Sequence, residues 1–162
     1  MDTQLLGTGG TYYVMSQLAL HELHASCTFG NAPYVDVLVS APDGSRTVAI
    51  QVKTALWATR DRGRGSDRKP FELQWPLGHK AARLSNPWFF FALVDLRGLQ
   101  PDTIPDVYVV PSPFVAAYCA PWIDDVKWAR LHIGVEEMEP YKNRWELITE
   151  AIQSRVHVET GV

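Results

Sequence analysis

Cysteine is scarce in this sequence, and long apolar runs are missing. The two cysteines among 162 residues, Cys27 and Cys119, form no CxxC pair, so the sequence indicates neither a disulfide framework nor a thiolate metal site. The longest apolar run, from Trp88 to Val94, is far shorter than the roughly 18 residues that a membrane-spanning helix needs. The N-terminus lacks a basic segment followed by an apolar one. We therefore expect a cytoplasmic protein with no membrane segment.

An excess of positive charge is also absent. The net charge is −3 and the isoelectric point about 5.9, which argues against a protein that coats nucleic acid through bulk electrostatics. The positive charge is concentrated in residues 60–69, where five basic residues stand against two acidic ones and leave a local charge of +3. These basic residues are Arg60, Arg62, Arg64, Arg68 and Lys69. The stretch from 56 to 70 therefore predicts a mobile basic loop.

The length and composition are those of a folded domain. A hydrophobic fraction of 46% with 20% charged residues is typical of globular proteins. A chain of 162 residues is long enough for one good core and too short for two. We expect a single domain over residues 1–162, with a polar tail from about residue 156.

Apolar spacing and helix breakers divide the chain into alternating helices and strands. We expect a helix over 11–25 after the glycine-rich residues 7–10, a short strand and turn in 26–33, and a hairpin over 34–55. Further strands are expected over 71–75, 88–96 and 105–111, a helical turn over 79–84, a helix over 112–120 capped by Ser112, an alternating segment over 126–133 and a helix over 144–154. This order predicts an α/β or α+β fold around a central mixed sheet.

The hairpin is the most informative segment. Asp43-Gly44, flanked by alternating apolar residues, predicts a two-residue type I′ turn. That turn places Asp36 directly opposite Gln51 and makes Lys53 the diagonal neighbour of Asp36. The valines and isoleucine of both strands then share one face, and the polar residues share the other. One interpretation is an ordinary edge hairpin with a surface ion pair worth under ~1 kcal/mol. The other is a functional site.

The pattern Pro33…Asp36…Gln51-Val52-Lys53, preceded by an N-terminal helix, resembles the PD-(D/E)xK nuclease superfamily. Its QxK form is similar to the glutamine-containing branch, which includes small resolvase-like and homing-endonuclease-like domains. The resemblance implies a restriction-endonuclease-like sandwich, a central mixed β-sheet flanked by helices. Only the hairpin carries a specific match.

The resemblance implies hydrolysis of phosphodiester bonds in DNA with Mg²⁺ or Mn²⁺. The metal ligands would be Asp36, the side-chain oxygen of Gln51 and the backbone carbonyl of Val52, because hard cations prefer oxygen ligands. Lys53 would orient or activate the attacking water and neutralise charge on the phosphate. Asp36, Gln51 and Lys53 are thus the expected catalytic residues.

The sequence departs from this family near the first helix. Related domains often carry a glutamate there, about where Thr11 stands. Thr11 cannot replace that charge, and Asp36 would be the only clear anionic ligand. Two functions therefore remain: a small metal-dependent DNA endonuclease, or a catalytically inactive nuclease-fold domain that binds nucleic acid or a protein partner.

The expected partner is DNA, held by the arginines and Lys69 of the basic loop. Lys80 stands before a possible helix, where it touches a phosphate or faces water. Trp57 lies between the lysine strand and the basic loop, where stacking on a base is conceivable beside a plain packing role. A single site cuts one strand, so we also expect a homodimer.

Overall fold

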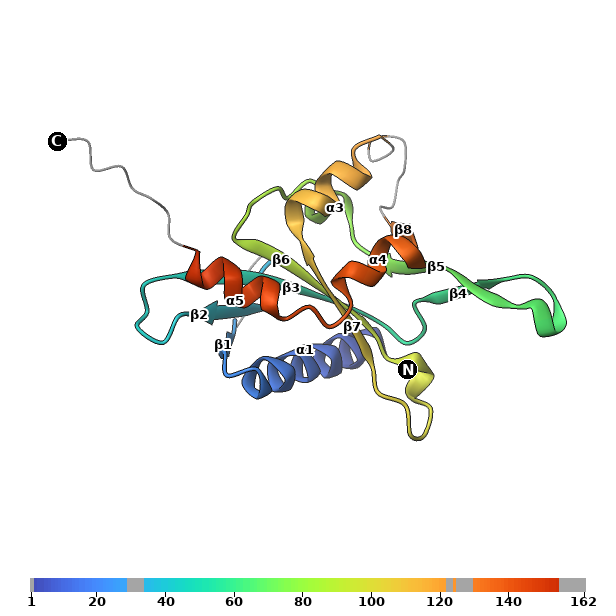
Figure 1. Ribbon diagram of the computed structural model, residues 1–162, viewed down its shortest axis with the longest axis horizontal. Coiled ribbons are helices and arrows are strands. Elements are labelled where there is room, and N and C mark those ends of the chain that lie inside the picture. The colour runs from blue at the N-terminus through green and yellow to red at the C-terminus, as the bar shows by residue number, and fades with distance from the viewer. Residues whose placement is uncertain (1, 29–33, 122–123, 125–129, 155–162) are drawn as a thin grey trace.

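The computed structural model describes residues 2–28, 34–121, 124 and 130–154. Its helices are α1 (Thr3–Leu20), α2 (His79–Ala82), α3 (Ser112–Cys119), α4 (Val135–Met138) and α5 (Glu146–Gln153), with short 3-10 turns η1 (Gly65–Asp67), η2 (Arg97–Leu99) and η3 (Glu139–Tyr141). Its strands are β1 (His24–Cys27), β2 (Val37–Ser40), β3 (Thr47–Ala55), β4 (Thr59–Arg62), β5 (Lys69–Pro76), β6 (Phe89–Asp95), β7 (Asp106–Pro111) and β8 (Arg130–Gly134) (Figure 1). The expected turn at Pro33 and the polar tail from about residue 156 lie outside the described residues.

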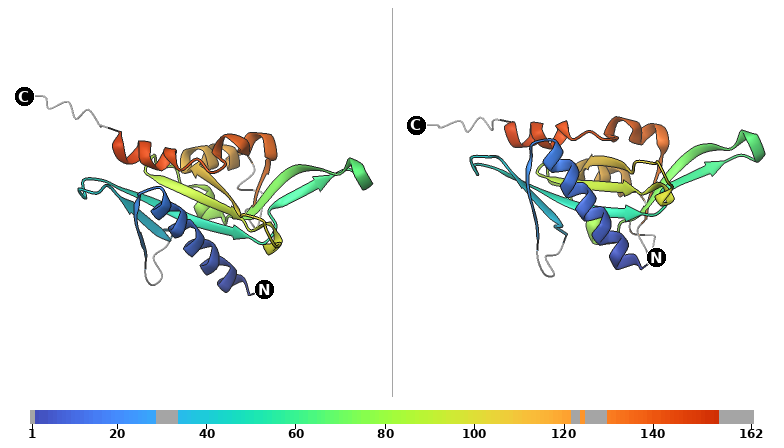
Figure 2. Two further views of the ribbon diagram at one scale, coloured as in Figure 1. Left: turned by 60° about the horizontal axis from the view of Figure 1, so that its bottom comes forward. Right: turned by 90° about the horizontal axis from the view of Figure 1, so that it is seen from below.

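The strands form two sheets. The larger has five strands in the order β1-β2-β3-β6-β7, and the smaller has three in the order β4-β5-β8. Only β3 and β6 run parallel, so the five-stranded sheet is mixed. The β4–β5 hairpin projects away from the body of the molecule (Figures 1 and 2). The expected central mixed sheet is confirmed.

Apolar layers cover both faces of the five-stranded sheet. On one face, α1 and α5 pack on the valines of β2 and β3 and on alternate residues of β6 and β7. On the other face lie α2, α3 and the inner side of the three-stranded sheet. The expected buried strand is confirmed, because every residue of β6 is buried and β6 lies between β3 and β7. The sheet is therefore flanked by helices, as predicted.

The first helix begins eight residues earlier than predicted. The Asp2 carboxylate accepts hydrogen bonds from the amides of Gln4 and Leu5, at 2.7 and 3.2 Å, and so caps the helix. The glycine-rich residues 7–10 thus lie inside α1 and do not lead into it. The helix also ends earlier, at Leu20, and Glu22 follows with a left-handed φ of 59°.

Gly10 explains why a glycine is useful inside this helix. Gly10 is buried where α1 crosses β3, and a Cβ at this position would overlap the Thr54 hydroxyl and lie 2.8 Å from Thr54 Cγ2. A side chain would push the helix off the sheet. The outward side of α1 is uncharged and leaves Leu5, Tyr12 and Leu20 exposed.

The β2–β3 hairpin has the predicted register but a different turn. Val37 faces Ile50 and Leu38 faces Ala49, as expected. The Ala41 amide donates to the Arg46 carbonyl, and the Gly44 amide donates to the Ala41 carbonyl, both at 2.9 Å. The loop is therefore residues 42–45, and of the two turn residues predicted to have positive φ only Gly44 has it. The type I′ prediction was wrong because Pro42 has no amide for a pair with Ser45 and suits the first central position of an ordinary turn.

Two smaller expectations also change. The basic stretch is a β-hairpin, formed by β4, η1 and the start of β5, so the prediction of a loop was wrong. Ser112 is the first residue of α3 and not its cap; its hydroxyl donates to the Asn86 carbonyl and accepts from the Asn86 amide.

No helix in the described part of the chain is long and apolar enough to cross a membrane.

We predict opposite stability effects for two neighbouring glycines of α1. Gly10→Ala should lower the free energy of unfolding by about 1–3 kcal/mol, because the new methyl group overlaps Thr54. Gly9→Ala is the matched control: its Cβ meets nothing within 4 Å, and alanine in a helix interior should raise stability by about 0.5–1 kcal/mol. Urea unfolding measures both. Equal effects of the two substitutions would contradict the close packing of α1 on β3.

Candidate functional site

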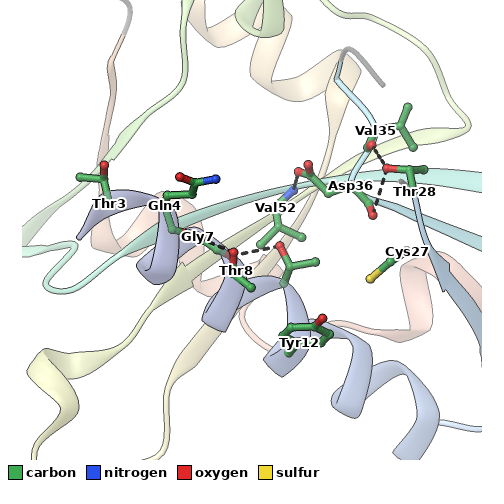
Figure 3. Close-up of a pocket in the computed structure, with 11 residues that line it drawn as sticks. Thr3, Gln4, Gly7, Thr8, Tyr12, Cys27, Thr28, Val35, Asp36 and Val52 are labelled. Atoms are coloured by element: carbon green, nitrogen blue, oxygen red, sulfur yellow. Dashed lines mark hydrogen bonds between the residues drawn. The ribbon is translucent and has the colours of Figure 1, made fainter. Parts of the chain in front are cut away.

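Asp36 lies just before β2 and is held by hydrogen bonds through both its backbone and its side chain. Its amide donates to the Ile50 carbonyl at 2.9 Å, and its carbonyl accepts from the Thr28 amide at 3.0 Å. Its carboxylate oxygen Oδ2 accepts the Val52 amide at 2.7 Å (Figure 3). Two neighbouring segments thus fix both the backbone and the side chain of Asp36.

The carboxylate fills a gap in the sheet. The ladder between β2 and β3 ends at the pair Val37 and Ile50, while β3 continues to Ala55. The Val52 amide therefore faces an edge that no strand of the described chain covers, and Asp36 accepts its hydrogen bond instead. The amide and carbonyl of one strand residue point to the same side, so the Val52 carbonyl faces this edge too.

A cavity of about 400 Å³ opens beside this edge, under the N-terminal half of α1 (Figure 3). Its lining consists of Thr3, Gln4, Gly7, Thr8, Thr11, Tyr12, Cys27, Thr28, Val35, Asp36 and Val52. Asp36 is the one charged side chain of this described lining. The other polar groups are hydroxyls, an amide and a thiol.

Gln51 and Lys53 lie on the opposite face of β3 from Val52. Gln51 is 7% exposed, and its side-chain oxygen Oε1 has no hydrogen-bond partner in the described part of the chain. An unpaired buried oxygen is costly. Because β3 lies between β2 and β6, the interpretation as an ordinary edge hairpin does not describe this pair of strands.

Lys53 is half-buried on the same face as Gln51. Burial lowers the pKa of its ammonium group, and the negative charge of Asp36 partly opposes that shift. No ion pair within 4.0 Å joins Lys53 to Asp36 or to any other residue that the structure describes. The ammonium is therefore poorly solvated and without a close counter-ion.

Thr11 faces the cavity but does not stand near the start of the helix. It lies in the middle of α1, and its hydroxyl donates to the Gly7 carbonyl at 3.1 Å. The expected position at the beginning of the helix was wrong, because the Asp2 cap moves that beginning to Thr3. Thr11 and Asp36 nevertheless border one space.

The oxygen donors at this edge are of the type that Mg²⁺ and Mn²⁺ take. They are the second oxygen of Asp36, the Val52 carbonyl and nearby hydroxyls; Mg²⁺ is commonly held by one or two carboxylates plus water and phosphate. Within residues 2–28, 34–121, 124 and 130–154 there is no group of three or more His, Cys, Asp or Glu that would hold a metal on its own. A single carboxylate predicts weak affinity.

The predicted nucleic-acid contacts do not border the cavity. The five cations of residues 60–69 are exposed on the β4–β5 hairpin, and Lys80 is exposed on α2. Trp57 lies at the base of the hairpin, 47% exposed, with its indole against Gly98. The lining of the cavity includes none of these residues.

Sequence reasoning missed Asp95, which ends the buried strand β6. Its carboxylate is 1% exposed and accepts from the amide and hydroxyl of Thr59 and from the Arg97 amide, at 2.9–3.1 Å. Asp95 therefore ties the first residue of the projecting hairpin to the central sheet. The signal was a lone aspartate at the end of an apolar strand.

A five-stranded mixed sheet with helices on both faces and a carboxylate at an open strand edge define the architecture of this protein. The chain is similar to the structure of a bacterial homing endonuclease, I-Ssp6803I, with a TM-score of 0.54 over 93% of this chain and 94% of that one. The sequence identity is 11%, so this similarity concerns the fold. No protein-family model matches the sequence. No curated protein matches it either.

We predict that Lys53 makes stability depend on pH. Its lowered pKa means that the unfolded chain binds its proton more tightly, so stability rises with pH between the lowered pKa and 10.5. Lys53→Met should remove this rise and stabilise the protein at pH 7. Urea unfolding from pH 7 to 10.5 measures both effects. The same treatment of Lys80→Met, an exposed control, should change neither; a pH profile of Lys53→Met that matches the parent would contradict the prediction.

Proposed function

We propose that this protein is a metal-dependent DNA endonuclease of the glutamine-containing PD-(D/E)xK branch. The observation that carries the proposal is the Asp36 carboxylate on the Val52 amide at an open strand edge, with Lys53 one residue further along β3. The similarity in fold to a homing endonuclease supports it. We propose a cytoplasmic location for this endonuclease.

The residues divide the chemistry between them. Asp36, the Val52 carbonyl and Gln51 Oε1 would hold Mg²⁺ or Mn²⁺, which when bound polarises the phosphate and lowers the pKa of a bound water. A water oxygen attacks phosphorus and that water gives up one proton, while the bond to the leaving sugar oxygen breaks and that oxygen takes up one proton. Lys53 places positive charge where the phosphate gathers negative charge. Its lowered pKa lets it exchange a proton nearer neutral pH than an exposed lysine.

An inactive domain that binds nucleic acid or a protein partner is the second candidate. Two observations favour it. The cavity holds a single carboxylate, and the helix position that faces it is Thr11. The half-buried Lys53 and the unpaired oxygen of Gln51 favour catalysis instead, because groups that destabilise the fold are kept at functional sites.

We predict that the protein nicks or linearises supercoiled plasmid in Mg²⁺ or Mn²⁺, and that Lys53→Met and Asp36→Asn each reduce the rate at least about 100-fold. Both substitutions keep side-chain size and remove the charge. The assay follows the conversion of supercoiled to open-circular and linear DNA, with light scattering on the same sample. Linear product from a dimer supports the proposed homodimer, and open-circular product from a monomer contradicts it.

The control for plasmid cleavage is Arg130→Met, which removes an exposed cation of β8 that belongs to neither the candidate site nor the predicted nucleic-acid contacts. It should cleave like the parent. If the parent binds DNA but cleaves none in either metal, the endonuclease proposal is wrong and the inactive nucleic-acid-binding domain is the better function. Cleavage that survives Lys53→Met would place the chemistry elsewhere.

We also predict that Thr11→Glu strengthens metal binding. The substitution adds a second carboxylate to the lining of the cavity opposite Asp36, and affinity for Mn²⁺ should rise at least about tenfold. Ser16→Glu is the matched control, because Ser16 is exposed on the same helix and does not line the cavity. Titration with Mn²⁺, followed by electron paramagnetic resonance, measures both. Equal affinities of the two variants would show that Thr11 does not face a metal position.

A further inference from the structure

The outer part of the β4–β5 hairpin, residues 60–71, is a two-stranded ribbon in which every residue is exposed. It extends beyond the part of β5 that pairs with β8 and projects from the body of the protein in three views (Figures 1 and 2). It carries a charge of +3 in a chain whose net charge is −3. An exposed cationic ribbon on an otherwise acidic protein is a local electrostatic site for an anion of matching shape.

The strand register groups the cations on one face. Side chains alternate along β4, so Arg60 and Arg62 share a face. Lys69 stands directly opposite Arg62, whereas Arg60 pairs with Glu72 across an irregularity in the ladder. Asp61 pairs with Pro70 on the other face, and both residues border a second cavity of about 330 Å³ against the body of the protein. The ribbon thus has an inner face turned to the protein and an outer cationic face.

The arginines of the ribbon are not equivalent. The guanidinium of Arg62 lies 5.0 Å from the centre of the exposed Phe71 ring, which orients its planar group. Arg60 donates to the carbonyls of Trp57 and Thr59, and Arg68 lies 3.6 Å from Asp61. Arg64 and Lys69 make no ion pair with any residue that the structure describes.

We propose that this ribbon enters the major groove of duplex DNA, where Arg62 reads a guanine while Arg64 and Lys69 bind phosphates. A major groove about 12 Å wide admits a two-stranded ribbon, and a planar guanidinium matches the O6 and N7 acceptors of guanine. The contact with Phe71 restricts the conformations of the Arg62 side chain before binding, so less conformational entropy is lost when Arg62 contacts the base. The unpaired cations Arg64 and Lys69 suit phosphate, which carries no sequence information.

The ribbon and the candidate site lie within reach of one duplex. Thr59 at the ribbon's base is seven residues along the chain from Val52 at the open edge, a span of at most about 25 Å. That length corresponds to about seven base pairs at 3.4 Å each. Asp95 anchors the base of the ribbon to the central sheet through Thr59. This inference specifies the substrate of the proposed endonuclease as duplex DNA, but its test does not need cleavage.

The first experiment measures binding without metal. Fluorescence anisotropy in EDTA compares a labelled duplex of mixed sequence with its separated strand, over a range of salt concentrations. We expect the parent to bind the duplex at least about tenfold more tightly than the strand. Arg64→Ala and Lys69→Ala should each reduce the salt slope by about 0.9, the value for one lost phosphate contact. Arg130→Ala, at the far end of the three-stranded sheet, removes one exposed cation and should leave the slope unchanged.

The second experiment measures sequence preference. Duplexes with a randomised centre are selected for binding to the parent, again in EDTA, and sequenced. The parent should enrich guanine at one position, and the enrichment should disappear in Arg62→Ala and weaken in Phe71→Leu, which removes the ring face. Arg64→Ala should keep the preferred base while it binds more weakly.

The binding experiments and the cleavage assay test the two proposals independently. Equal binding of duplex and single strand, no enriched base in the parent, or a guanine preference that survives Arg62→Ala would each overturn the inference, whatever the plasmid assay shows. Ribbon-dependent binding of duplex without any cleavage would uphold the inference and reject the endonuclease.

Discussion

The hydrogen bond from the Val52 amide to the Asp36 carboxylate determines the geometry of the candidate site. β3 runs on where β2 stops, so its next backbone groups face an edge without a neighbouring strand. An unpaired amide there would lose a hydrogen bond, and Asp36 supplies the acceptor at 2.7 Å. The same contact fixes a negative oxygen beside the Val52 carbonyl. One local requirement of the sheet therefore creates a cluster of oxygen donors.

The two faces of β3 explain why the polar residues matter. Its valines and isoleucine pack under α1 and α5, while Gln51 and Lys53 turn toward the other core. Neither residue improves packing: the Gln51 oxygen has no partner among the residues that the structure describes, and burial disfavours the charge of Lys53. Both lie within one residue of Val52, at the edge where Asp36 is held. The two groups that destabilise the fold therefore lie at the edge where the proposed catalysis needs a cation and an oxygen ligand.

The molecule also separates its charges by position. The chain outside the ribbon is acidic. It is also tightly packed, because Gly10 lets α1 contact Thr54 of β3 directly. The cationic ribbon extends from that body and is tied to it by the buried carboxylate of Asp95. A rigid base with an exposed charged extension suits recognition of a large polyanion better than binding of a small ligand.

Alternation along the sequence determined the faces of both hairpin strands and the buried strand β6, and a turn centred on Asp43-Gly44 gave the β2–β3 register. That register ends at Val37 and Ile50, so Asp36 binds the Ile50 carbonyl and the Val52 amide and does not pair with Gln51 as predicted. Tertiary structure decided what depends on distant partners. The Asp2 cap and the contact of Gly10 with Thr54 placed glycines inside α1. The β4–β5 ladder, anchored at its base by Asp95 and β8, made the expected basic loop a ribbon. Asp36 accepts from the Val52 amide where no strand of the described chain covers the edge of β3. Periodicity reports which face of a strand is buried, but it carries no information about what covers that face or where a neighbouring strand ends.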